Sequence, residues 1–351
     1  MIDIFFNNLK MGEIKFKIDY SEKIGQGGFG EVFTAYDKND KKRIKTKYAA
    51  KKMPENLQDE NNLNLFTNEI LVSTQFNNPN LVRFYGLTED NDCIFMIYEY
   101  CNGGDLNKYL RQYYQKYKKG IGEKEVQKIL KDILNGLSCL HRNKVIHHDI
   151  KPANILLQYK TEQDMENLNI FNCTFKLSDF GLAKFKDDNL SLHAVGTATF
   201  MDPICTIFNQ MDKFNEDKTD IWSIGILTYR MLFTNTHPFI ANELWRQNDP
   251  NQYLKNMKDN IMKGEYFVNI GIYVVSKEAL CFLDSCLKLN QEHRKSSEDL
   301  EYTWFVSRNV NKFHFVNADN YDIEIPNNYR GVYEVKFDIC SENKIEDSFN
   351  L

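Results

Sequence analysis

The sequence has no long hydrophobic run, no paired cysteines and only a small net charge. No stretch of about 18 apolar residues occurs, and Met1–Lys10 lacks the basic start and apolar core of a signal peptide. The eight cysteines form no C-x-x-C pair and no zinc-ligand spacing, which is typical of reduced, structural thiols. A net charge of -5 gives no whole-chain reason to expect nucleic acid as a partner. These absences favour a soluble, cytoplasmic protein that acts on small molecules or proteins.

The length and the hydrophobic patterning predict two lobes. A chain of 351 residues exceeds the size at which one hydrophobic core usually keeps growing. The first part alternates as strands do and contains one helical stretch, 63–76, which Asn77-Asn78-Pro79 ends. Asn102-Gly103-Gly104 then predicts a hinge. In this first part the strands are expected at 16–20, 31–36, 48–53 and 93–100.

Helices dominate after the hinge. The segment 123–141 places its apolar residues on one face, and 220–233 is apolar enough to be buried. The polar segment 158–173 is interpreted as an elongated hairpin loop, and alternation over 333–339 predicts a half-buried strand. The expected fold is therefore α+β, with a small β-rich lobe and a larger α-helical lobe. A ligand is expected in the cleft between them.

A glycine-rich segment lies between the first two expected strands. Residues Ile24 to Val32 read I-G-Q-G-G-F-G-E-V, and such glycines let a backbone approach phosphate oxygens while Val32 covers a base. Alone the motif is weak, because a plain glycine hairpin and a dinucleotide-binding turn share it. A dinucleotide site needs a helix that opens at the glycines, whereas Glu31–Tyr36 continues as a strand.

A lysine and a glutamate follow the glycine-rich segment. On a strand, Ala49 and Lys51 face the same side, which leaves room for an adenine and a charge for its phosphates. An isolated lysine is usually only a surface residue. Glu69 lies on the next expected helix, where it could pair with Lys51 and hold it towards a nucleotide.

Two polar segments between apolar strands carry the strongest signal. In V-I-H-H-D-I-K-P-A-N-I-L, Asp149 can orient the proton of an attacking hydroxyl, Lys151 can neutralise phosphoryl charge, and the amide oxygen of Asn154 can bind Mg²⁺. In L-S-D-F-G-L, Asp179 can bind a metal ion that bridges phosphates. Either segment alone could be a plain polar turn, but both in this order indicate phosphoryl transfer.

These motifs together resemble the eukaryotic protein kinase family, and the match runs from about Tyr20 to Phe305. The resemblance implies the bilobal kinase fold, with ATP and Mg²⁺ as cofactors. It implies an N-terminal extension at 1–15, a kinase domain at 16–306, with an N-lobe at about 16–100 and a C-lobe at about 101–306, and a C-terminal tail at 307–351.

The resemblance also assigns residues to roles. Tyr98 falls at the gatekeeper position, and Asp220 begins the buried helix that supports the catalytic loop. The implied catalytic residues are Asp149, Lys151 and Asn154, and the implied metal ligands are Asn154 and Asp179. The implied nucleotide-binding residues are Ile24, Gly25, Gly27, Gly30, Val32, Ala49, Lys51, Glu69, Glu99, Cys101 and Asp105, with backbone groups of Glu99 and Cys101 facing adenine and Asp105 near the ribose.

The segments 149–154 and Gly196-Thr197 resemble those of serine/threonine kinases, so protein substrates with Ser or Thr acceptors are expected. The alternative is a pseudokinase, a scaffold that binds a nucleotide or a protein without catalysis. Such a protein has usually lost Lys51, Asp149 or Asp179, and all three are present. The oligomeric state is left open.

Three positions depart from the family pattern. His148 stands where an arginine is usual, and a histidine that titrates near neutrality grips a phosphorylated loop less well. We therefore expect weak dependence on phosphorylation at Ser191, Thr197 or Thr199. Asp202-Pro203-Ile204 stands where the family motif usually reads A-P-E. Arg294, which matches the arginine near the end of the larger lobe, therefore loses its expected acidic partner. Either another acid substitutes or the site is more exposed. Ser73 occupies a commonly apolar helix position and could loosen that helix.

Overall fold

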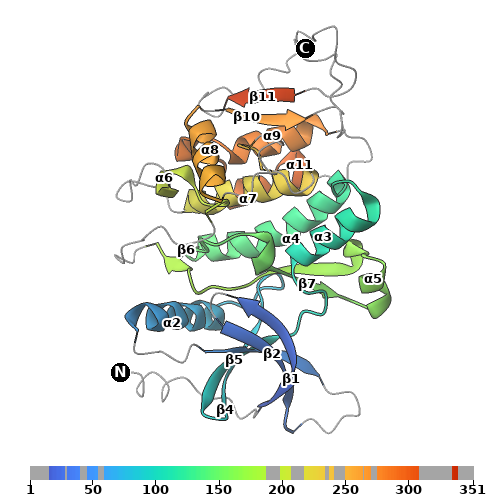
Figure 1. Ribbon diagram of the computed structural model, residues 1–351, viewed down its shortest axis with the longest axis vertical. Helices are drawn as coiled ribbons and strands as arrows, with labels where there is room; N and C mark the ends of the chain where they lie inside the picture. Colours follow the sequence, from blue (N-terminus) through green and yellow to red (C-terminus); the bar gives the residue numbers. More distant parts are fainter. Residues whose placement is uncertain are drawn as a thin grey trace.

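The computed structural model has a sheet-rich part and a helical part, stacked along the long axis of the molecule (Figure 1). The expected bilobal α+β fold is therefore confirmed. The structure describes residues 16–27, 30–39, 46–53, 59–186, 198–206, 217–233, 237–240, 250–263, 265–269, 275–307 and 334–338.

The N-lobe is built on one antiparallel five-stranded sheet, in the order β1-β2-β3-β5-β4. One face buries a small aromatic and aliphatic cluster that includes Phe16, Phe33 and Phe95. Helix α2 (Glu60–Gln75) lies against the sheet near the C-lobe, as Figure 1 shows. The strands are β1 (Phe16–Gly27), β2 (Gly30–Asp37), β3 (Lys47–Lys52), β4 (Phe84–Asp90) and β5 (Cys93–Glu99).

The pleat of β3 decides which of its side chains face helix α2. Ala50 is fully buried in the small aromatic cluster, so its neighbours Ala49 and Lys51 project to the opposite face. Across the sheet Lys51 is paired with Val32 on β2 and with Met96 on β5. The expected alternation therefore brings Lys51 to the side that faces α2.

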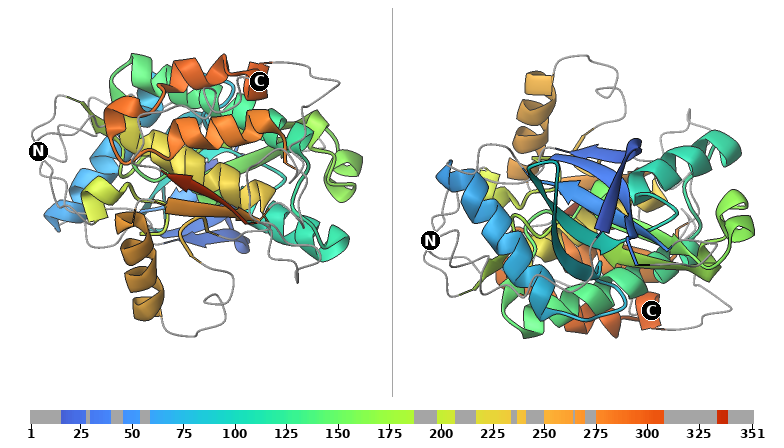
Figure 2. Two further views of the ribbon diagram at one scale, coloured as in Figure 1. Left: turned by 90° about the horizontal axis from the view of Figure 1, so that it is seen from above. Right: turned by 90° about the horizontal axis from the view of Figure 1, so that it is seen from below.

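The C-lobe is organised around two buried helices, α4 (Glu123–Arg142) and α7 (Asp217–Leu232). The apolar face of α4 is fully buried, as the spacing of its leucines and isoleucines predicts. The other helices of this lobe are α3 (Leu106–Tyr117), α6 (Pro203–Thr206), α8 (Pro250–Met262), α9 (Lys277–Cys286), α10 (Ser297–Glu301) and α11 (Trp304–Ser307). In Figure 2 most of them lie beside that pair, whereas α8 projects away from it.

Two short antiparallel strand pairs hold the polar segments where the lobes meet. Strand β6 (Val145–Ile146) pairs with β9 (Lys184–Phe185), and β7 (Ile155–Tyr159) pairs with β8 (Cys173–Leu177). The segment 147–154 follows β6 and precedes β7, while 178–183 connects β8 to β9. Both candidate catalytic segments are thus anchored at each end by a strand.

The segment between β7 and β8 is more ordered than the expected loop. It contains helix α5 (Glu162–Glu166) and a 3-10 turn at Ile170–Asn172. Thr161 begins α5 because its side chain accepts a hydrogen bond from the backbone N–H of Asp164. The hairpin was predicted, but the prediction of a simple loop at its end was wrong. A single capping residue is a weak sequence signal in a segment that is polar throughout.

The alternating segment near the C-terminus forms a strand, and the structure gives its partner. Strand β11 (Glu334–Asp338) pairs antiparallel with β10 (Glu265–Asn269), and Figure 1 shows both at the end of the C-lobe far from the sheet. The predicted strand is confirmed. Its partner could not be predicted because about 70 residues separate the two strands.

Candidate active site

The glycine-rich segment lies at the end of the β1–β2 hairpin. Gly25 is paired with Val32, and Gly27 with Gly30, so Gly25 and Gly27 lie on β1 and Gly30 and Val32 on β2. Gly30 has a φ of 134°, and a Cβ there would come within 2.5 Å of the Lys52 carbonyl oxygen. Only glycine fits this position. A strand and not a helix follows the glycines, which excludes the dinucleotide-binding alternative.

The structure brings Lys51 and Glu69 together, as the sequence predicts. Lys51 Nζ lies 2.7 Å from each carboxylate oxygen of Glu69 and 3.0 Å from Asp179 Oδ1. Burial alone would lower the pKa of Lys51, but these two carboxylates outweigh it and the pKa is raised. Lys51 is therefore a fixed cation between α2 and the segment that carries Asp179.

Asp149 is buried, and two neighbouring side chains hold its carboxylate. Its Oδ2 accepts from Lys151 Nζ at 2.7 Å and from Asn154 Nδ2 at 2.7 Å. Asn154 Nδ2 also donates to the Asp149 carbonyl at 2.9 Å. Since the amide nitrogen of Asn154 faces Asp149, its amide oxygen is the atom that can bind a metal ion.

The segment that carries Asp179 is tied to the one that carries Asn154. Ser178 donates to the Asn154 carbonyl through both its backbone N–H and its hydroxyl, each at 3.0 Å. Asp179 has a φ of 66°, a left-handed conformation that aspartate tolerates better than most residues. The two candidate metal ligands are thus fixed relative to one another by backbone contacts.

Asp220 at the start of α7 supports the loop from below. Its carboxylate accepts from the backbone N–H groups of His147 at 2.8 Å and His148 at 2.9 Å, and contacts His141 Nε2 at 2.9 Å. Burial raises the pKa of Asp220, but the hydrogen bond and charge of His141 outweigh burial and lower it. His141, which also contacts Ser297 Oγ at 3.0 Å, was missed from the sequence because no motif includes it.

The hinge residues are fixed by contacts that the sequence did not suggest. Glu99 accepts from the Arg83 backbone N–H at 2.6 Å and pairs with Lys176 of β8 at 3.0 Å. Cys101 is buried, and the Asp105 side chain caps α3 by accepting from the Lys108 N–H at 2.8 Å. A nucleotide role for these residues stays a prediction.

His148 is not the near-neutral group that the sequence suggested. Burial lowers its pKa to about 4, and its Nε2 is buried without a hydrogen-bond partner among the residues that the structure describes. The expected titration near neutrality is therefore wrong. A neutral, inward-facing imidazole is a poor ligand for a phosphate group.

The protein should become less stable as the pH is lowered. The reason is that His148 and the buried His237 both have folded-state pKa values of about 4, where 6.5 is ordinary. Between these values the unfolded chain binds protons that the folded chain does not. We expect each histidine to lower the free energy of unfolding by about 1 kcal/mol per pH unit from about pH 6 to pH 5. Urea unfolding at several pH values measures this slope. A His148→Asn variant should reduce it, and an unchanged slope would contradict the assignment.

Arg294 has a partner, and it lies two residues from the expected place. Asp202 and Arg294 form a fully buried ion pair, in which Arg294 Nη2 is 3.3 Å from Asp202 Oδ1. Gln291 Nε2 donates to Asp202 Oδ2 at 2.8 Å, and the guanidinium lies 4.9 Å from the Trp222 ring centre. Of the two alternatives left open, substitution by another acid is correct, and exposure of the site is wrong.

Few of the candidate acceptor residues fall in the described part of the chain. Thr199 does, and its carbonyl accepts from His237 Nε2 at 2.9 Å. Ser191, Gly196 and Thr197 lie outside the described residues.

Comparison with known proteins agrees with this geometry. The family model described as protein kinase domain matches residues 18–305. The chain is 29% identical over 305 residues to the mouse serine/threonine-protein kinase tousled-like 2, covering 82% of this chain and 39% of that protein. It is 30% identical over 288 residues to human tousled-like 1 (77% and 34%), and 28% identical over 301 residues to rat myosin light chain kinase 2 (84% and 44%).

The chain spans less than half the length of these relatives. Across the described residues, no helix is both long and apolar enough to cross a membrane. The family match covers most of the chain and includes both polar segments that meet between the lobes. The chain belongs to the protein kinase family.

Proposed function

We propose that this chain transfers the γ-phosphoryl group of ATP to serine and threonine hydroxyls of proteins, with Mg²⁺ as the metal ion. The observation that carries the proposal is the convergence of Lys51, Asp149, Asn154 and Asp179 where the lobes meet. Its relatives named serine/threonine-protein kinases support the acceptor class.

The proton-handling and cationic side chains divide the chemistry between them. Asp149 orients the acceptor hydroxyl and takes its proton, and Lys151, 2.7 Å from that carboxylate, offsets charge on the moving phosphoryl group. Lys51, held by Glu69, positions the phosphates of ATP. The alternative, a pseudokinase scaffold, is less well supported because each of these groups is present and oriented by a neighbour.

The residues present fit Mg²⁺. The Asp179 carboxylate and the Asn154 amide oxygen are hard oxygen ligands, and Mg²⁺ commonly uses one or two such groups together with substrate phosphates and water. In the described ranges there is no cluster of three or more acidic, His or Cys side chains that would hold a metal without the nucleotide. Asp179 and Asn154 would hold the metal ion, which would supply positive charge against the negative charge of the ATP phosphates.

The metal requirement tests the assignment of Asp179 and Asn154. Peptide phosphorylation should require added Mg²⁺ and stop with a chelator, and Asp179→Asn should remove most activity at every Mg²⁺ concentration. Activity of the variant equal to wild type would show that Asp179 does not bind the metal ion.

We propose that activity depends only weakly on phosphorylation of the activation segment. His148 replaces the arginine that grips a phosphate, and its buried Nε2 cannot donate to one. Phosphatase treatment, confirmed by mass spectrometry, should therefore lower kcat by less than about threefold. A loss of about a hundredfold would reject this idea.

Two further points remain proposals. The sequence composition favours a cytoplasmic location, and the motifs favour a kinase domain at 16–306 that uses ATP and protein substrates and no nucleic acid. Fractionation of tagged protein in its own cells tests the location.

A further inference from the structure

Tyr98 on β5 reaches the buried carboxylate of Glu69. Its hydroxyl donates to Glu69 Oε1 at 2.9 Å and lies 3.5 Å from Ser73 Oγ. Burial raises the pKa of Tyr98 well above its usual value, so the hydroxyl stays protonated and remains a donor. Glu69 is thus gripped from two strands of the sheet, by Lys51 on β3 and by Tyr98 on β5.

Glu69 and Ser73 lie four residues apart and hence on the same face of α2. Both are buried, at 4% and 6% exposed, and both face the hydroxyl of Tyr98. The contact face of α2 is therefore partly polar, and one tyrosine joins its two polar positions to the sheet. The expectation that Ser73 loosens α2 stays a prediction, but the structure gives its hydroxyl a polar neighbour.

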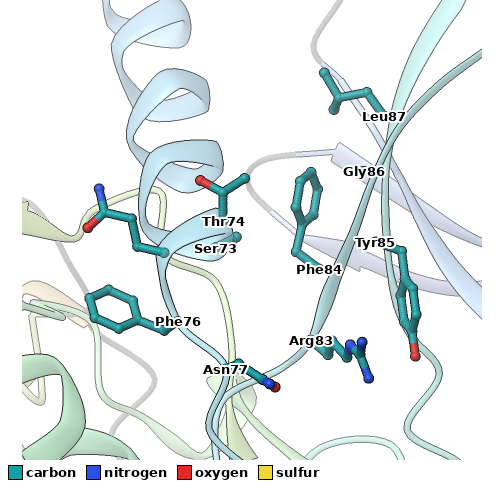
Figure 3. A pocket seen from close by; sticks show the side chains of 10 residues that line it. Ser73, Thr74, Phe76, Asn77, Arg83, Phe84, Tyr85, Gly86 and Leu87 are labelled. Carbon is teal, nitrogen blue, oxygen red and sulfur yellow. The ribbon is translucent and has the colours of Figure 1, made fainter. Parts of the chain in front are cut away.

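Packing does not close the space between the last turn of α2 and β4. A pocket of about 380 Å³ lies there, and Ser73, Thr74 and Phe84 are among the residues that line it (Figure 3). Two of these residues also contact Tyr98. The Ser73 hydroxyl lies near the Tyr98 hydroxyl, and the ring centres of Phe84 and Tyr98 are 5.3 Å apart. Side-chain packing therefore holds this side of α2 only in part. The hydrogen bond from Tyr98 to Glu69 adds a second restraint on the helix.

We propose that Tyr98 is a positioning residue that holds Glu69, and through Glu69 holds Lys51, in the arrangement that phosphoryl transfer requires. This inference rests on the proposed role of Lys51 in positioning the phosphates of ATP. Because Tyr98 belongs to β5 and not to the activation segment, this restraint on α2 needs no phosphorylated side chain.

The variant Tyr98→Phe removes the hydroxyl and keeps the ring against Phe84. A hydrogen bond to a charged group is lost, so we expect kcat to fall about tenfold. The Michaelis constant for ATP should change less than about threefold, because orientation of the phosphates matters most in the transition state. Steady-state kinetics with ATP varied at fixed peptide separates the two constants.

Tyr109→Phe is the matched control. The Tyr109 hydroxyl is also buried but has no hydrogen-bond partner within the part of the chain that the structure describes, so its removal should leave kcat within about twofold. In a Glu69→Gln background, Tyr98→Phe should cause little additional loss, because both changes break the same chain of contacts.

A second measurement does not need catalysis. Amide hydrogen exchange over 66–75 should be faster in Tyr98→Phe than in wild type or Tyr109→Phe, since a restraint on α2 is lost. Unchanged exchange, or an equal loss of kcat in the wild-type and Glu69→Gln backgrounds, would overturn the inference. If the wild-type protein transferred no phosphate from ATP, the proposed function would fail, while the exchange experiment would still decide whether Tyr98 holds α2.

Discussion

Replacement of Asp149 by asparagine is expected to lower kcat by roughly 10²–10⁴-fold, the usual range for removal of a positioned general base. Asp149 is buried, and Lys151 and Asn154 both donate to its Oδ2, so the carboxylate is oriented before any substrate arrives. Asparagine keeps the size of the side chain but cannot accept a proton. Initial rates at saturating ATP and peptide measure the effect.

Asp92→Asn is the control for this substitution. Asp92 is exposed in the β4–β5 turn with a φ of 58°, a conformation that asparagine tolerates well, so its rate should equal that of wild type. An Asp149→Asn enzyme with more than a tenth of the wild-type kcat would contradict the role given to Asp149.

The second large effect concerns stability. Asp202→Asn should lower the free energy of unfolding by about 3–5 kcal/mol, because it leaves the Arg294 charge buried without its partner. Arg294 is 2% exposed, and its other contacts with described residues are carbonyl oxygens and the Trp222 ring, none of which carries a full negative charge. Urea unfolding followed by tryptophan fluorescence measures the change.

An exposed ion pair provides the comparison. Arg142 Nε lies 3.5 Å from Glu298 Oε1, and both side chains are largely exposed. Glu298→Gln should therefore lower the free energy of unfolding by no more than about 1 kcal/mol. If Asp202→Asn cost as little as Glu298→Gln, the buried pair would not stabilise this part of the C-lobe.

Local pattern was sufficient for some elements, although strand β4 was not expected, and for which candidate site residues come together. The leucine and isoleucine spacing predicts α4 almost to the residue, and β-alternation correctly puts Ala49 and Lys51 on one face of β3. Asp149 and Asn154 come together because the turn between β6 and β7 is short. In these cases the contacts are set by a few neighbouring residues.

Contacts between distant segments could not be predicted in this way. Asp202 and Arg294 are 92 residues apart, and the sequence shows only that an expected glutamate is missing. The low pKa of His148 depends on burial, which a motif does not reveal. Tyr98 was assigned to the gatekeeper position, but its bond to Glu69 requires the relative placement of β5 and α2.

The most direct test of the central claim is transfer of label from γ-labelled ATP to a library of Ser, Thr and Tyr peptides, with wild-type and Asp149→Asn proteins side by side. We predict Mg²⁺-dependent labelling of Ser and Thr peptides by wild type, and at most about a hundredth of that rate with the variant. Absence of labelling by wild type above the variant, or labelling confined to Tyr peptides, would contradict the account.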